Sequence, residues 1–119
     1  MKTEVRVTKS FKKAIKPLLK KYASLMGELA ALESSLIENP RFGTPLGDNS
    51  YKIRLKIKSK QKGKSGGARI ITYLETEIIG IIGQAEETTT VYLLTIYDKS
   101  ETANITDSEL RELIKYLES

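Results

Sequence analysis

The sequence contains no cysteine, no histidine and no tryptophan among its 119 residues. Without cysteine the chain has no disulfides and no thiolate chemistry, and without histidine as well it lacks the usual zinc ligands. The absence of histidine also removes the commonest general base and the commonest activator of a nucleophile. Any catalysis must therefore rely on Lys, Arg, Tyr, Asp or Glu.

Long apolar segments are absent too. No run approaches the roughly 20 residues that span a bilayer. The first residues, MKTEVRVTKSFKK, lack the apolar stretch of a signal peptide. We expect a cytoplasmic protein without membrane contact, and the length suits a single domain over residues 1–119.

The charges are present in quantity but unevenly placed. The net charge is +5, yet residues 51–69 hold eight Lys or Arg side chains and no acid, whereas residues 70–119 hold ten acids and three bases. Such segregation creates a local positive field and indicates a polyanion, nucleic acid above all, as a partner. A solvated Lys-rich face that serves only solubility is the alternative.

The N-terminal half predicts one strand and two helices. Alternation of polar and apolar residues over 4–8 predicts a short first strand. Apolar residues at helical spacing follow, with Ser10 as a candidate N-cap and Pro17 expected to kink or split the helix. A second helix, capped by Ser24, carries a stripe of leucines and ends before a loop at 41–50. The short link between the helices predicts an antiparallel helical hairpin.

The C-terminal half predicts strands and a last helix. Strict alternation over 51–58 gives one apolar face and one row of cations, and 68–77 and 88–99 predict two further strands. Residues 78–87 either extend the strand before them or form an inserted hairpin, and 106–118 predict a helix with a capping box. The order β-α-α-β-β-β-α predicts an α+β fold with helices on one face of a small, mainly antiparallel sheet.

Three stretches resemble the RelE/ParE superfamily of bacterial toxins, and more closely its RelE/HigB-type branch. YKIRLKI (51–57) is similar to the family's basic strand after the helical hairpin. KGKSGGARIITY (62–73) is similar to the loop and strand with the Gly-x-Arg element, here Gly67-Ala68-Arg69. VYLLTIYDKSE (91–101) and the helix after it resemble the HigB-type last strand and terminal helix. The resemblance implies a RelE-like fold.

The same resemblance implies a function. It implies the toxin of a type II toxin–antitoxin system, which enters the ribosomal A site and cleaves mRNA there, so that translation is inhibited. The implied reaction is metal-independent: a ribose 2′-hydroxyl attacks the adjacent phosphodiester, and no cofactor takes part. The implied partners are the ribosome, mRNA and a cognate antitoxin, which often carries a helix-turn-helix domain.

This reaction needs proton transfer and stabilisation of the extra charge on phosphorus. Clustered Lys and Arg can supply both, because close cations lower one another's pKa and guanidinium forks match phosphate oxygens. Lys52 and Arg54 match basic positions of the family's catalytic strand, and Arg69 matches its phosphate-binding Arg. The catalytic candidates are Lys52, Arg54, Lys56, Arg69, Tyr97 and Lys99. The candidates for RNA binding are Lys58, Lys60, Lys62, Lys64 and Tyr73.

Several alternatives stay open at this point. Relatives carry a catalytic Tyr near the C-terminus, where this sequence has Ile105-Thr106, so the base is either Tyr97 or a Lys with a lowered pKa. Arg69 could instead pair with Glu75 or Glu77. The whole chain could be a ParE-like inhibitor of DNA gyrase, or a module that binds nucleic acid without cutting it.

Overall fold

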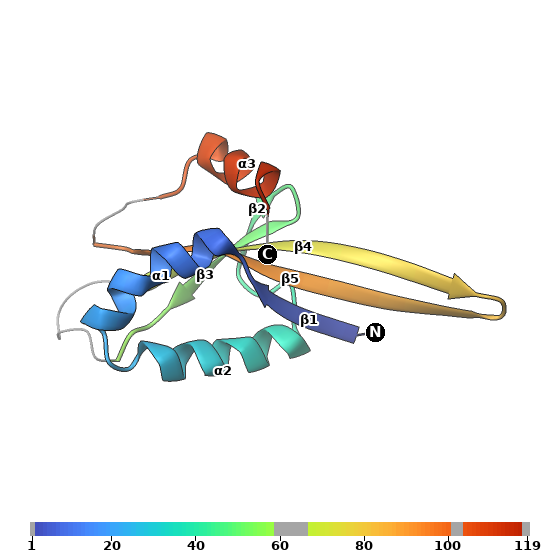
Figure 1. Cartoon of the computed structure of the whole chain (residues 1–119), viewed down its shortest axis with the longest axis horizontal. Helices are drawn as coiled ribbons and strands as arrows, with labels where there is room; N and C mark the ends of the chain where they lie inside the picture. Colours follow the sequence, from blue (N-terminus) through green and yellow to red (C-terminus); the bar gives the residue numbers. More distant parts are fainter. Residues whose placement is uncertain (1, 59–66, 101–103, 118–119) are drawn as a thin grey trace.

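A five-stranded sheet forms the centre of the computed structural model, which describes residues 2–58, 67–100 and 104–117 (Figure 1). The strand order is β1-β5-β4-β3-β2, and all neighbouring pairs are antiparallel except β1 with β5. The α+β class and the mainly antiparallel sheet are therefore confirmed. The elements are β1 (Lys2–Val7), α1 (Lys9–Lys21), α2 (Leu25–Glu38), β2 (Thr44–Gly47), β3 (Ser50–Leu55), β4 (Ala68–Ile81), β5 (Gln84–Asp98) and α3 (Asp107–Lys115).

The larger part of the core lies between one face of the sheet and the first two helices. The apolar stripes of α1 and α2 supply the helical side of this core, for example Phe11 and Leu25. Alternate residues of the central strands, such as Ile53, Ile70 and Val91, supply the other side and are almost fully buried. The predicted alternation of β3 is thus confirmed, and it leaves the strand's cations on the opposite face.

That opposite face is covered by α3, so the expectation of helices on one face only is wrong. Ile70 and Ile71 are neighbours in β4 and both are fully buried, which requires cover on both sides of the sheet. Ile71 packs with Leu94 of β5 and Leu110 of α3 in a second, smaller core. In Figure 1, α3 lies above the strands and α2 below them.

The start and the middle of α1 also differ from the prediction. Thr8, not Ser10, is the N-cap: its hydroxyl accepts from the backbone N–H of Phe11 and donates to the carbonyl of Leu93. Pro17 does not split the helix, which continues to Lys21. Buried residues on both sides of the proline face the same core, and this burial outweighs the missing backbone hydrogen bond.

Residues 41–50, expected to be a loop, contain the short edge strand β2. It pairs with the first residues of β3 through a tight turn at Asp48 and Asn49, which have φ angles of 52° and 56°. Asp and Asn tolerate this left-handed conformation better than most residues, and the turn suits a two-residue hairpin. The element order therefore has one strand more than predicted.

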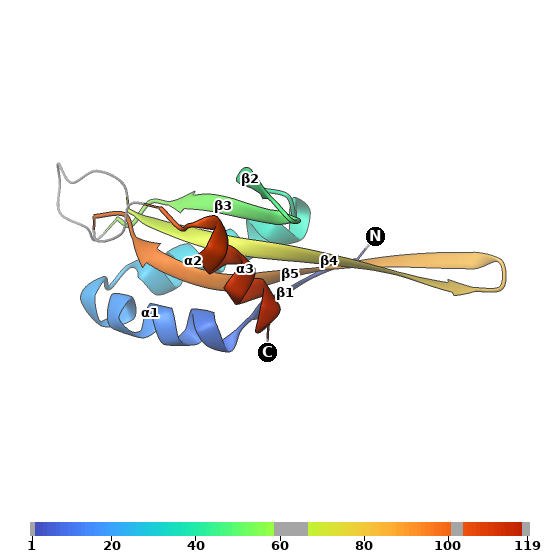
Figure 2. The same ribbon diagram turned by 90° about the horizontal axis from the view of Figure 1, so that it is seen from above.

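The segment 78–87 both extends the preceding strand and forms a hairpin. β4 continues to Ile81 and β5 begins at Gln84, so the two strands pair along their whole lengths. β3 pairs with β4 only as far as Tyr73, and β1 pairs with β5 only from Thr88 onward. The hairpin beyond these points is a two-stranded arm that projects from the rest of the sheet, and the whole molecule, arm included, is 56 Å in its longest dimension (Figure 2).

Candidate nucleic-acid interface

Arg54, Arg69 and Tyr97 form a row across three adjacent strands. The register places Arg54 of β3 directly opposite Arg69 of β4, and Arg69 directly opposite Tyr97 of β5. All three belong to the face that α3 covers in part, because they alternate with residues of the larger core. Two strand spacings separate the ends of the row by about 10 Å. The sheet thus brings together three of the six catalytic candidates.

Arg69 is the most constrained member of this row. Its side chain is only 6% exposed, and its guanidinium donates one hydrogen bond, of 3.2 Å, to the carbonyl oxygen of Ala68. No carboxylate of the described residues forms an ion pair with it, and both Glu75 and Glu77 are exposed further along β4. A buried cation without a counter-ion is costly, and a like charge directly across the strand adds to that cost. A bound anion would offset both.

Gly67 permits the close approach of strands at this site. Its φ is +140°, and a Cβ atom there would overlap the carbonyl oxygen of Leu55. Only glycine accepts such a contact, so this residue allows β4 to begin directly against the end of β3. The Gly-x-Arg element therefore has a physical reason: the glycine sets the position from which Arg69 enters the sheet.

Tyr97 contributes a buried hydroxyl to the row. This hydroxyl has no hydrogen-bond partner among the described residues, although the backbone of Ile105 lies near it. Burial raises the pKa of Tyr97 above its ordinary value, and the Ile105 backbone and the charge of Arg69 offset this only in part. The phenol therefore stays protonated at neutral pH and suits a proton or hydrogen-bond donor better than a base. It borders a cavity of about 470 Å³ between β5 and α3.

The lysine candidates lie around the row. Lys52 is half-buried, and its ammonium group contacts the side-chain oxygen of Asn104 at 3.4 Å. Lys99 is also half-buried, and its backbone N–H donates to the carbonyl of Gly67 at 3.0 Å. Lys56 and Lys58 follow β3 and are exposed. Three further candidates lie outside the described residues: Lys60, Lys62 and Lys64.

Tyr73 shares the face of Arg69, as alternation predicts, but not the site. It pairs with Tyr92 across β5, with ring centroids 6.4 Å apart, and packs against the smaller core under α3. Four residues of extended strand separate it from Arg69, which is about 13 Å. The structure thus places Tyr73 beside α3 rather than beside the cations.

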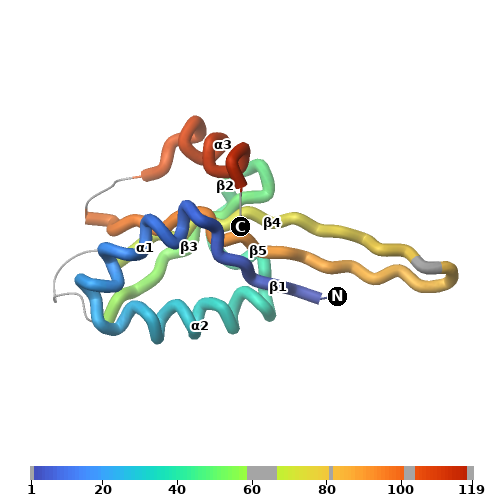
Figure 3. Tube along the Cα trace, in the orientation of Figure 1, coloured from blue at the N-terminus to red at the C-terminus, as the bar shows by residue number. Residues whose placement is uncertain are grey.

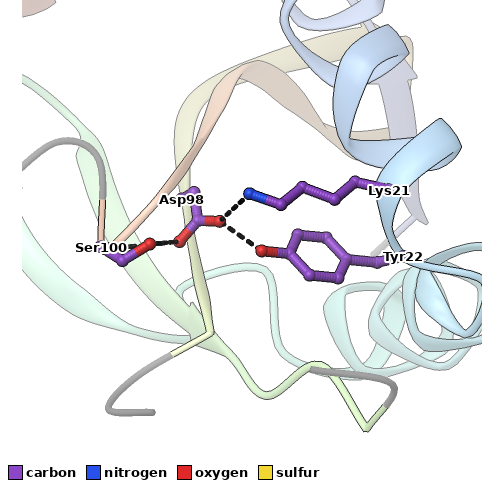
Figure 4. Close-up of polar contacts among 4 residues, drawn as sticks. All are labelled: Lys21, Tyr22, Asp98 and Ser100. Carbon is purple, nitrogen blue, oxygen red and sulfur yellow. Dashed lines mark hydrogen bonds and ion pairs between the residues drawn. The ribbon is translucent and has the colours of Figure 1, made fainter. Parts of the chain in front are cut away.

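A buried carboxylate that the sequence did not single out fixes the end of β5. Asp98 is 2% exposed and accepts hydrogen bonds from the hydroxyl of Tyr22 at 2.6 Å and from the Ser100 hydroxyl at 2.7 Å (Figure 4). The Ser100 backbone N–H donates to it at 2.9 Å, and the Lys21 ammonium lies 4.0 Å away. Asp98 stands between Tyr97 and Lys99 in the chain, so these contacts connect the end of α1 to the strand end that carries both.

This arrangement can bind a phosphate and donate a proton to it. Guanidinium groups supply persistent positive charge and paired N–H donors, and the phenol supplies a further donor. Among the described residues, no three acidic side chains cluster as metal ligands would. None of the helices in the described ranges is long and apolar enough to cross a membrane.

No family model matches the chain, and no solved structure matches it. The resemblance to the RelE/ParE superfamily therefore stays a prediction from the sequence.

Proposed function

We propose that this protein is the toxin of a type II toxin–antitoxin system and cleaves mRNA in the ribosome without a metal. The observation that carries the proposal is Arg69, a buried cation in a row of functional groups and without a counter-ion among the described residues. The sequence resemblance supplies the substrate and the reaction. Cytoplasmic location and neutralisation by an antitoxin belong to the same proposal.

Each group of the row has a role in this reaction. Arg69 and Arg54 hold the scissile phosphate and stabilise the charge that it gains as the ribose 2′-oxygen attacks. Tyr97, whose pKa burial raises, gives its proton to the leaving 5′-oxygen. A lysine beside the row, Lys52 or Lys99, takes the 2′-hydroxyl proton through its neutral amine form and becomes an ammonium. The bond from phosphorus to the 5′-oxygen breaks as the bond to the 2′-oxygen forms, which leaves a cyclic phosphate.

The proposal is tested by mapping mRNA ends after the protein is induced in a bacterial host. We expect growth arrest and new 5′ ends within translated messages. Arg69→Ala should abolish both, because loss of one well-placed charge donor lowers such rates by about 10²–10³. Arg111→Ala is the matched control, since Arg111 is an exposed arginine of α3 outside the row. Growth arrest with intact transcripts would contradict the proposal and would favour a gyrase inhibitor.

A further inference from the structure

The arm formed by the ends of β4 and β5 lacks support from the rest of the chain. Beyond Leu74, whose backbone N–H donates to the carbonyl of Asn49, and before Thr88 neither strand has an outer neighbour among the described residues, so both backbone edges are open. An isolated two-stranded hairpin is marginally stable in water, and open edges readily pair with another chain. The arm therefore has the properties of a segment that docks on a partner.

The surface of the arm is apolar and acidic. Ile78 is 69% exposed, Ile79 55% and Ile82 fully, although these are side chains that normally lie inside a protein. Four glutamates lie on the same two strands, and residues 70–97 contain no Lys or Arg. These glutamates are Glu75, Glu77, Glu86 and Glu87. The partner surface should therefore combine apolar side chains with positive charge.

A groove with these properties lies between α2 and the end of β3 on the same chain. It has a volume of about 570 Å³, a wall of small residues on α2 and an apolar side provided by Phe42, which is 42% exposed. Lys58 borders it, together with Arg54, which lies at the outer edge of the sheet beyond the end of β2 and so is next to the groove as well as in the row. The Glu28 carboxylate within the groove already accepts from the backbone N–H of Lys58 at 2.6 Å. β2 pairs with β3 only as far as Lys52, so the outer edge beyond is open to a further strand.

We propose that the arm of one copy docks in the α2–β3 groove of a second copy. The arm cannot reach the groove of its own chain, because it leads away from α2 and β3 (Figure 3). Arm-to-arm contact is disfavoured, because it would bring two sets of four carboxylates together. In the groove, these carboxylates would instead lie beside cations. Reciprocal exchange of arms closes two copies into a dimer. This inference does not rest on the proposed function.

The test is the self-association of the full chain, measured by sedimentation velocity from 1 to 100 μM. We expect a concentration-dependent dimer. The arm variant Glu77→Lys with Glu86→Lys and the groove variant Lys58→Glu with Arg54→Glu should each weaken association at least tenfold. An equimolar mixture of the two variants should restore it, because the reversed charges match again. Ala31→Trp, which fills the groove, should also weaken association at least tenfold.

Lys16→Glu is the matched control, since Lys16 is exposed on α1, away from both surfaces, and its charge reversal should leave association unchanged. Circular dichroism of every variant establishes that it is folded. A wild-type chain that stays monomeric at 100 μM would overturn the proposal. So would a dimer that persists in the arm variant or the groove variant, or a mixture of the two that fails to associate.

Discussion

Replacement of Asp98 tests whether the end of β5 depends on its buried carboxylate. Asp98→Ala removes the acceptor for the Tyr22 hydroxyl and for two donors of Ser100. Ser100 is exposed and regains hydrogen bonds from water, whereas the Tyr22 hydroxyl lies in a buried position. A hydrogen bond to a charged group contributes about 1.5–3 kcal/mol, and a buried donor left unpaired costs about 1–3 kcal/mol.

These terms partly overlap, and removal of a buried charge recovers some desolvation free energy, so we expect a loss of about 3 kcal/mol in the free energy of unfolding. Asp98→Asn keeps an acceptor oxygen and should cost about 1–1.5 kcal/mol. In the double variant Tyr22→Phe with Asp98→Ala the hydroxyl that loses its Asp98 acceptor is also gone. The double variant should therefore lose about 1–2 kcal/mol less than the sum of the two single losses.

Urea unfolding followed by circular dichroism at pH 7 measures the wild type and the four variants, the single variant Tyr22→Phe included, with equal m-values as the check that the two-state analysis holds. A loss below 1 kcal/mol for Asp98→Ala would refute the reasoning. Strict additivity in the double variant would refute it as well, because it would mean that Tyr22 and Asp98 do not interact.

Three further predictions concern the titration of Tyr22, the backbone at Gly67 and the phenol of Tyr97. The pKa of Tyr22 is raised above 10.0, first by burial and then by Asp98, so this group's contribution to stability is complete below pH 10 and is lost as the pH rises further. In urea unfolding, Tyr22→Phe should therefore lose less stability than the wild type between about pH 9.5 and 11.5. An identical slope of stability against pH in the two proteins would argue against the raised pKa. Gly67→Ala should lower the free energy of unfolding by at least about 2 kcal/mol, because the alanine would have a positive φ and its Cβ would overlap the backbone of Leu55. A melting temperature unchanged from wild type would contradict the close approach of β3 and β4. Tyr97→Phe should leave the free energy of unfolding unchanged or raise it by up to about 1 kcal/mol, since it removes a buried hydroxyl without a partner among the described residues. The same variant should cleave mRNA at least tenfold more slowly. Lower stability with full cleavage would contradict the role of Tyr97 as the proton donor.

Local patterns predicted the parts of the fold that depend on neighbouring residues. The alternation in β3, the leucine stripe of α2 and the capping box at Thr106 and Glu109 are all present in the structure. Each of these signals repeats within a few residues, so periodicity and spacing are enough to find it. The same logic placed Arg54, Arg69 and Tyr97 on sheet strands but could not give their register.

Long-range contacts decided the rest. Tyr22 belongs to the larger core, as its helical spacing with the apolar stripe of α1 indicates, but its partner Asp98 is 76 residues away and no local signal connects them. Thr8 replaces Ser10 as the cap because its hydroxyl also bonds the carbonyl of Leu93 in β5. The position of α3 on the second face depends on Ile71 and Leu94, and Leu94 reaches that face through a bulge in β5 that alternation alone does not reveal.

The most direct test of the central claim is cleavage of mRNA on the ribosome by the wild-type chain and by Arg69→Lys. Phosphate binding by the row of Arg54, Arg69 and Tyr97 requires the paired N–H donors of a guanidinium at position 69, and not positive charge alone. We predict new RNA ends for the wild type in a translating extract, and at least tenfold fewer for a folded Arg69→Lys protein. Equal cleavage by the two proteins, or no cleavage by the wild type, would contradict the account.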